Sequence, residues 1–225
     1  MRQIFTTMTA LLALLATATG VRAETVDNYS YDFNTSINTS DHTFRVATGW
    51  GHIVDAFTYE NPYSGTQTKY QNYGYESTGG VTGGWLHVYG EEIGYTYGDI
   101  YHTSTDMIVT PKITGTASIY IKGQSTYYAP VAKFYKVTKQ GNTYVAGEEL
   151  TVDMSNVNTS TWTKVELPAM EGEYIGIHGS YIGLDDFAVN GTAELDLQKA
   201  MTVGNVKIAD AAPVCNEENK FCLLY

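Results

Sequence analysis

The sequence has little of what zinc-binding, membrane-spanning and helical proteins need. It holds two cysteines in 225 residues, and a cysteine pair without a nearby histidine or a second pair does not make a zinc site. Beyond the amino end, no apolar run reaches the roughly 20 residues of a transmembrane helix. No stretch repeats its apolar residues with the period of an amphipathic helix. Composition therefore points away from helical bundles and membrane spans.

Catalytic motifs are missing as well. Ser180 stands in Gly-Ser-Tyr-Ile-Gly, which is not the arrangement of a nucleophile elbow, and there is no His-Glu-x-x-His zinc motif. Adjacent carboxylates on a strand point to opposite faces and cannot act together as the acid and nucleophile of a glycosidase. This applies to Glu91-Glu92, Glu148-Glu149 and Asp185-Asp186. We predict that the chain is not an enzyme.

Positive charge is also scarce. The 13 Lys and Arg residues face 24 Asp and Glu residues, which gives a formal net charge of −11. Such a surface repels nucleic-acid phosphates and anionic membranes at long range, and it suits a divalent cation. We therefore expect no nucleic-acid partner.

What the sequence does contain favours β-structure. It has 19 Tyr and 22 Gly, and Tyr, Thr, Val and Ile suit pleated surfaces while Gly and Asn supply turns. Residues 117–122 alternate, with Ala117, Ile119 and Ile121 on one face and the intervening polar residues on the other. The same reading predicts a hairpin that turns near residues 139–142 and further strands at 131–137, 162–167, 174–178 and 184–189. The fold class is therefore predicted as an all-β sandwich.

The amino end follows the pattern of a secretory signal peptide. Arg2 gives a positive start, an apolar run covers residues 10–18, and Val21-Arg22-Ala23 offers a small-residue cleavage site. The apolar run is too short to span a bilayer. We predict that residues 1–23 are removed by cleavage near Ala23 and that the protein is secreted or held at the cell surface.

The remaining chain is long enough for one sizeable core and a short extension. We predict an antiparallel β-sandwich domain over residues 24–192 and a tail over residues 193–225. The tail has a candidate strand at 203–208. In an oxidising compartment, Cys215 and Cys222 could close a small disulfide loop within it.

Four segments in this order resemble the cleaved-adhesin, or choice-of-anchor J, family. They are Tyr31-Asp32-Phe33, Gly49-Trp50, the stretch from Ile108 to Ile113, and the closing stretch from Tyr181 to Val189. The resemblance covers roughly residues 28 to 191 and implies a jelly-roll sandwich, related in shape to MAM and galactose-binding-like domains. It also implies a secreted or surface-attached bacterial protein that binds glycans or host proteins.

Asp185 is the main candidate for a metal ligand. Strand alternation places it on the same face as Phe187 and Val189, so its carboxylate should be buried at the core or its rim. A buried carboxylate needs compensation. One alternative is a structural calcium ion, which related jelly rolls often hold near this strand, with Asp32, Asn34 and Asp41 as further ligands. The other is a set of backbone amides from a neighbouring loop.

Aromatic residues crowd the stretch between residues 59 and 101, where loops look long. Aromatic rings stack against the C–H face of a sugar, so these residues are candidates for glycan binding, although Tyr also fills ordinary β surfaces. The predicted ligand-binding residues are Tyr63, Tyr73, Tyr75, Trp85, Tyr95 and Tyr97. Trp50 and Trp162 are interpreted as packing residues.

Two functions remain open at this point. The first is an adhesive or carbohydrate-binding module without catalysis of its own, whose partner is a glycan or an extracellular protein. The second is a structural accessory domain of a larger secreted protein, which binds a protein partner. An aromatic cluster exposed on one face would favour the first. The sequence does not indicate an oligomeric state.

Overall fold

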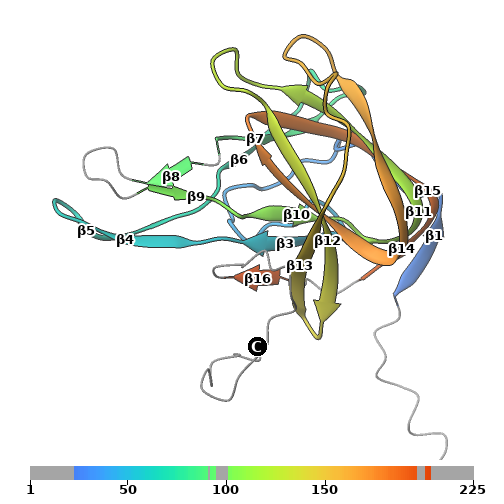
Figure 1. The fold of residues 1–225 in the computed structure, drawn as a ribbon, viewed down its shortest axis with the longest axis horizontal. Helices are drawn as coiled ribbons and strands as arrows, with labels where there is room; N and C mark the ends of the chain where they lie inside the picture. The colour runs from blue at the N-terminus through green and yellow to red at the C-terminus, as the bar shows by residue number, and fades with distance from the viewer. Residues whose placement is uncertain (1–22, 91, 95–100, 197–200, 204–225) are drawn as a thin grey trace, which may run out of the picture.

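The computed structural model describes residues 23–90, 92–94, 101–196 and 201–203, and all regular elements in them are strands (Figure 1). The strands are β1 (Glu24–Asp27), β2 (Ser30–Tyr31), β3 (Gly51–Val54), β4 (Phe57–Asn61), β5 (Gly65–Lys69), β6 (Tyr73–Glu76), β7 (Trp85–Val88), β8 (Glu92–Gly94), β9 (Tyr101–Thr103), β10 (Met107–Val109), β11 (Lys112–Gly123), β12 (Val131–Gln140), β13 (Thr143–Leu150), β14 (Thr163–Ser180), β15 (Ile182–Leu195) and β16 (Met201–Val203). This part of the chain contains no helix long and apolar enough to cross a bilayer.

One large sheet curls into two facing layers (Figure 1). The first layer has the order β14-β11-β15-β7-β6, with β1 and β2 pairing along β15. The second has the order β16-β3-β10-β14-β12-β13. Strand β14 joins the layers, because residues 163–173 pair with β11 and residues 174–180 pair with β12. The pairing is antiparallel except between β16 and β3, so the predicted all-β sandwich is confirmed.

The core lies between these layers and follows the predicted alternation. Ile119 and Ile121 of β11 are buried beside Val165 and Leu167 of β14, while Tyr120 and Lys122 point to the other face. Aromatic rings fill the region under β2 and β15, where Trp50 packs against Phe33, Tyr31 and Phe187. Each such buried side chain contributes roughly 1.5–3 kcal/mol from its removal from water.

Two hairpins extend from the sandwich, β4–β5 and β8–β9 (Figure 1). Each forms a separate two-stranded sheet. Tyr63 lies at the tip of the β4–β5 hairpin, where its side chain is 88% exposed. Neither hairpin therefore shares backbone pairing with the main sheet in the described part of the chain.

The carboxyl end of the described chain adds to the second layer. Strand β16 pairs in parallel with β3, matching Thr202 with Ile53. It begins before the strand predicted at 203–208, and residues 204–208 lie outside the described residues. Residues 1–22 of the predicted signal peptide, Tyr95, Tyr97, Cys215 and Cys222 also lie outside them, so those predictions stay predictions.

Candidate functional site

Asp185 is buried, as predicted, but it lies on the face opposite to the predicted one. Leu184 and Phe187 both enter the core, so two residues separate them instead of one. The pairing with β11 slips at this point: Asp185 stands opposite Tyr120, whose side chain points away from the core. Asp186 has a φ of 40°, and the resulting bulge turns Asp185 to the outer face. The expectation that Asp185 shares a face with Phe187 and Val189 is therefore wrong.

A loop of residues 77–84, the glycine loop, covers Asp185 on that outer face. It connects β6 to β7 with the sequence Ser-Thr-Gly-Gly-Val-Thr-Gly-Gly. The Val81 N–H donates to Asp185 Oδ2 at 2.5 Å, and the Asp186 N–H donates to Asp185 Oδ1 at 2.8 Å. Backbone amides thus satisfy the carboxylate, which is one of the two alternatives that the sequence left open.

The charge of Asp185 is only partly compensated in this place. Burial raises the pKa of its carboxyl to about 6, and the amide hydrogen bonds oppose that rise. Near neutral pH the group therefore carries a charge that its surroundings tolerate less well than water would. Few carboxyl groups in proteins titrate at this pH.

Glycine is required where the loop meets its supports. A Cβ on Gly80 would lie 2.4 Å from Asp185 Oδ2, and one on Gly83 would lie 2.1 Å from Asn34 Oδ1. The loop closes on itself through the Gly80 N–H, which donates to the Gly83 carbonyl at 2.9 Å. Its far end is held by Asn34 Oδ1, which accepts the Gly84 N–H at 2.8 Å. Because Gly80 and Gly83 have no side chain, the loop can lie close against the sheet at these two positions.

The predicted calcium ligands are only partly brought together. Asn34 contacts the glycine loop, and Asp32 accepts the N–H and the side-chain amide of Asn34 at 3.1 and 3.0 Å. Asp41 instead accepts the N–H and hydroxyl of Thr43. Within the described residues, no three His, Cys, Asp or Glu side chains are grouped to hold a metal. The oxygens of these side chains face N–H and O–H donors, so they do not form a ligand set as placed, and calcium stays a prediction.

The glycine loop also fixes two tryptophan side chains. The Trp85 indole N–H donates to the Thr78 carbonyl at 3.1 Å, and the Trp162 indole N–H donates to the Gly79 carbonyl at 3.0 Å. Their ring centroids lie 5.7 Å apart at an interplanar angle of 71°. Two residues that are 77 positions apart in the chain are thus oriented by adjacent carbonyls of one loop.

These two rings begin a row of four on the outer face of the first layer. We call this row the aromatic patch, and its members are Trp162, Trp85, His87 and Tyr89. Ring centroids are 5.3 Å apart for Trp85 and His87 and 3.9 Å apart for His87 and Tyr89. The row follows the period of β7, whose Leu86 and Val88 point into the core. Tyr89 is 41% exposed. Burial lowers the pKa of His87, which keeps its ring neutral near pH 7.

Two glycines of neighbouring strands form the floor of the patch. A Cβ on Gly183 would lie 2.8 Å from Trp162 Cη2 and 2.9 Å from Trp85 Cε3. Gly74 of β6 pairs with His87 of β7, and a Cβ on Gly74 would lie 2.8 Å from the Tyr89 hydroxyl. The missing side chains of these glycines let the rings approach the sheet closely.

The structure separates the predicted glycan-binding residues. Trp85 belongs to the aromatic patch, whereas Tyr63 stands alone on its hairpin. Tyr75 lies below the glycine loop, with its hydroxyl donating to the Asn34 carbonyl at 3.2 Å. Tyr73 points inward to Asp106 and does not belong to the aromatic patch.

The sequence reading missed His87 and Tyr89 and assigned Trp162 to packing. The stretch Trp85-Leu86-His87-Val88-Tyr89 alternates ring and aliphatic residue, a period-two signal that could have revealed the row. The contribution of Trp162 could not have been found in this way, because it comes from a distant strand.

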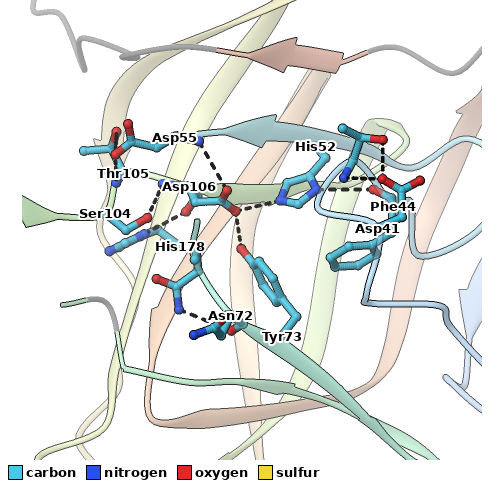
Figure 2. Close-up of polar contacts among 12 residues, drawn as sticks. Asp41, Phe44, His52, Asp55, Asn72, Tyr73, Ser104, Thr105, Asp106 and His178 are labelled. Carbon is cyan, nitrogen blue, oxygen red and sulfur yellow. Dashed lines mark hydrogen bonds and ion pairs between the residues drawn. The ribbon is translucent and has the colours of Figure 1, made fainter. Parts of the chain in front are cut away.

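A second polar cluster lies inside the protein at the base of the hairpins (Figure 2). Asp106, which is 2% exposed, accepts from His52 Nε2 at 2.6 Å and from the Tyr73 hydroxyl through the same oxygen. The other ring nitrogen of His52 lies 3.2 Å from the Phe44 carbonyl. Both nitrogens thus face acceptors, an arrangement that a protonated imidazole satisfies. Burial and the neighbouring Asp106 raise the pKa of Tyr73 well above its usual value.

The same cluster ties the hairpins to the sandwich (Figure 2). The Asp55 N–H, just before β4, donates to Asp106 Oδ2 at 3.2 Å, and Asp55 Oδ2 accepts the Thr105 N–H at 2.7 Å. His178 Nδ1 of β14 lies 2.8 Å from the Asp106 carbonyl. His52, Asp55 and Asp106 are almost fully buried, so this cluster holds elements in position inside the protein.

No protein-family model matches the chain, and no curated protein matches it. Among solved structures, it is similar to the CBM22-1 and GH10 modules of an endo-1,4-beta-D-xylanase from Clostridium thermocellum, solved with xylohexaose. That match has 13% identity and a TM-score of 0.37 over 77% of this chain, and it spans 28% of the xylanase chain. A cleaved adhesin domain of Lys-gingipain from Porphyromonas gingivalis is similar with 17% identity and a TM-score of 0.36, over 74% of this chain and 99% of that one.

Proposed function

We propose that the chain is a non-catalytic binding domain that holds a glycan on the aromatic patch. The observation that carries the proposal is the unbroken row of rings from Trp162 through Trp85 and His87 to Tyr89 on one face of the sheet. Sugar rings present C–H groups on one face, and aromatic rings are the surfaces that bind them. The glycine loop supports the proposal because it fixes the indoles in advance, which reduces the entropy that binding costs.

The proposal places the binding outside the cytoplasm. Its support is the signal-peptide pattern of residues 1–23. The acidic composition also disfavours nucleic acid as a partner.

A glycan array, followed by titration of the bound glycans, tests the proposal. The chain from Glu24 onward should bind a defined subset of the array. Trp85→Ala and Tyr89→Ala should each weaken that binding at least about tenfold, the equivalent of 1.4 kcal/mol. Tyr63→Ala is the matched control, because it removes an exposed tyrosine ring on the separate β4–β5 sheet and should leave the affinity unchanged.

Urea unfolding of each variant must accompany the titration, since Trp85 also bonds to the glycine loop. An array on which the chain binds no glycan would overturn the proposal and favour the accessory-domain alternative. Loss of binding in Tyr63→Ala with Trp85→Ala unaffected would move the site to the β4–β5 hairpin.

A further inference from the structure

Tyr181 adopts a backbone conformation that a bulky residue rarely takes. It has a φ of 54° in the turn between β14 and β15. Glycine would fit this turn without strain. Its ring stacks on that of Tyr128, with centroids 4.7 Å apart and an interplanar angle of 9°. Strained residues of this kind persist where the surrounding structure holds them and are common at ligand sites.

The tyrosine pair, Tyr128 and Tyr181, adjoins the Tyr89 end of the aromatic patch. The Tyr181 N–H donates to the Tyr89 carbonyl at 3.3 Å. Gly90 follows Tyr89 in the chain, and a Cβ on Gly90 would lie 2.5 Å from the Tyr181 hydroxyl. The ring of Tyr181 therefore extends over the backbone that follows the patch, on a glycine floor like that of Trp85.

Gln124 links the tyrosine pair to the other end of the patch. Its N–H donates to the Tyr181 carbonyl at 2.8 Å, and its side-chain Nε2 donates to the Lys122 carbonyl at 3.4 Å. A Cβ on Gly183 would lie 2.9 Å from this Nε2, as close as it would lie to the Trp85 and Trp162 rings. Ser125 Oγ then accepts the N–H groups of Tyr127 and Tyr128 at 3.1 and 3.0 Å. This turn presents Tyr128, 57% exposed, at the surface. One short segment thus joins the tyrosine pair and reaches Gly183, beside which the two tryptophan rings lie.

We propose that the aromatic patch and the tyrosine pair form one continuous site for an extended, uncharged glycan chain of several sugars. This inference rests on the proposed function. The combined surface offers a row of four rings and an adjoining stacked pair, which is more than a single sugar would contact. The net charge of −11 disfavours sulfated or uronic-acid polymers. Gln124 supplies an amide that can bond sugar hydroxyls without a charge.

The test is the dependence of affinity on chain length. Glycan arrays carrying uncharged chains of two to eight sugars, with sulfated and uronic-acid chains beside them, should give signals that grow with length on the uncharged series. Tyr181→Gly removes the ring and relieves the backbone strain, so the variant should fold at least as well as the parent chain. Tyr181→Gly and Tyr128→Ala should weaken binding of the longest chains at least tenfold and of the shortest chains less than twofold.

The outcomes separate this inference from the proposed function. Trp85→Ala should weaken short and long chains alike, because it removes the patch itself. Equal affinity for all lengths, or tyrosine variants that bind long chains as well as the parent does, would overturn the continuous site and leave the patch in place. A preference for the anionic chains would overturn the uncharged ligand. If no glycan binds, both proposals fail together.

Discussion

Asp106 and Asp185 are both removed from solvent, and the protein compensates them in different ways. Asp106 accepts from the side chains of His52 and Tyr73 and from the Asp55 N–H. Asp185 accepts from the backbone amides of Val81 and Asp186. A side-chain network of this kind holds several strands at fixed positions, whereas backbone amides hold the shape of a single loop.

The two arrangements also differ in charge. His52 Nε2 lies 2.6 Å from Asp106 Oδ1, so a protonated imidazole there would form an ion pair with this carboxylate. The amides of the glycine loop offset the charge of Asp185 only in part, and the pKa of this carboxyl is raised to about 6. We infer that the Asp106 cluster serves stability, and that Asp185 holds the loop that orients the two tryptophans of the aromatic patch.

Removing Asp106 should have the largest effect of the changes considered. Asp106→Ala leaves His52 buried without its carboxylate and frees the Tyr73 hydroxyl and the Asp55 N–H. We expect the free energy of unfolding to fall by about 3–5 kcal/mol, as is typical when one partner of a buried pair is lost. Urea denaturation gives the value.

Glu148→Ala, an exposed change on β13, is the control and should stay within about 0.5 kcal/mol of the parent. A loss below about 1 kcal/mol for Asp106→Ala would show that the cluster is not a stabilising network.

The contrast between the two acids also marks what the sequence could predict. Alternation placed Ile119 and Ile121 on one buried face, because the period of a strand is a local property of the sequence. Burial of Asp185 was predicted for the same reason. The face of the sheet on which Asp185 lies was not predicted correctly, because a bulge at Asp186 shifts the alternation and leaves no mark in the pattern of apolar residues.

Partners far apart in the chain were beyond such reasoning. His52 meets Asp106 across 54 positions, and Val81 meets Asp185 across 104. Their pairing depends on the order of strands in the sheet, which periodicity does not specify. The glycine loop was visible only as a run of turn-forming residues, and nothing local showed that it folds back over the sheet.

A smaller effect should appear in the pH dependence of stability. The pKa of the Asp185 carboxyl rises from a reference value of 3.8 to about 6 in the folded protein, so the folded state binds this proton more tightly. The contribution of Asp185 is therefore most favourable below about pH 4, and it is lost as the pH rises from about 4 to 6. Asp185→Asn cannot titrate.

Unfolding free energies of both proteins, measured from pH 4 to pH 7, isolate this contribution as their difference. The parent should lose stability relative to Asp185→Asn between pH 4 and pH 6, with the difference constant above that range. Parallel profiles would mean that Asp185 titrates normally and that the glycine loop does not bury its charge.

Chelation should have the smallest effect on the unfolding temperature. The Asp185 oxygens accept the Val81 and Asp186 amides, and Asp32 accepts two N–H groups of Asn34, so the amide arrangement needs no cation. We expect excess EDTA to leave the transition of the whole chain where it is. A lower transition that added calcium restores would instead establish calcium as the partner of Asp185, because a ligand that binds only the folded state raises its stability. Asp185→Asn should then lose the response to calcium, while Asp41→Asn would show whether the more distant predicted ligand takes part.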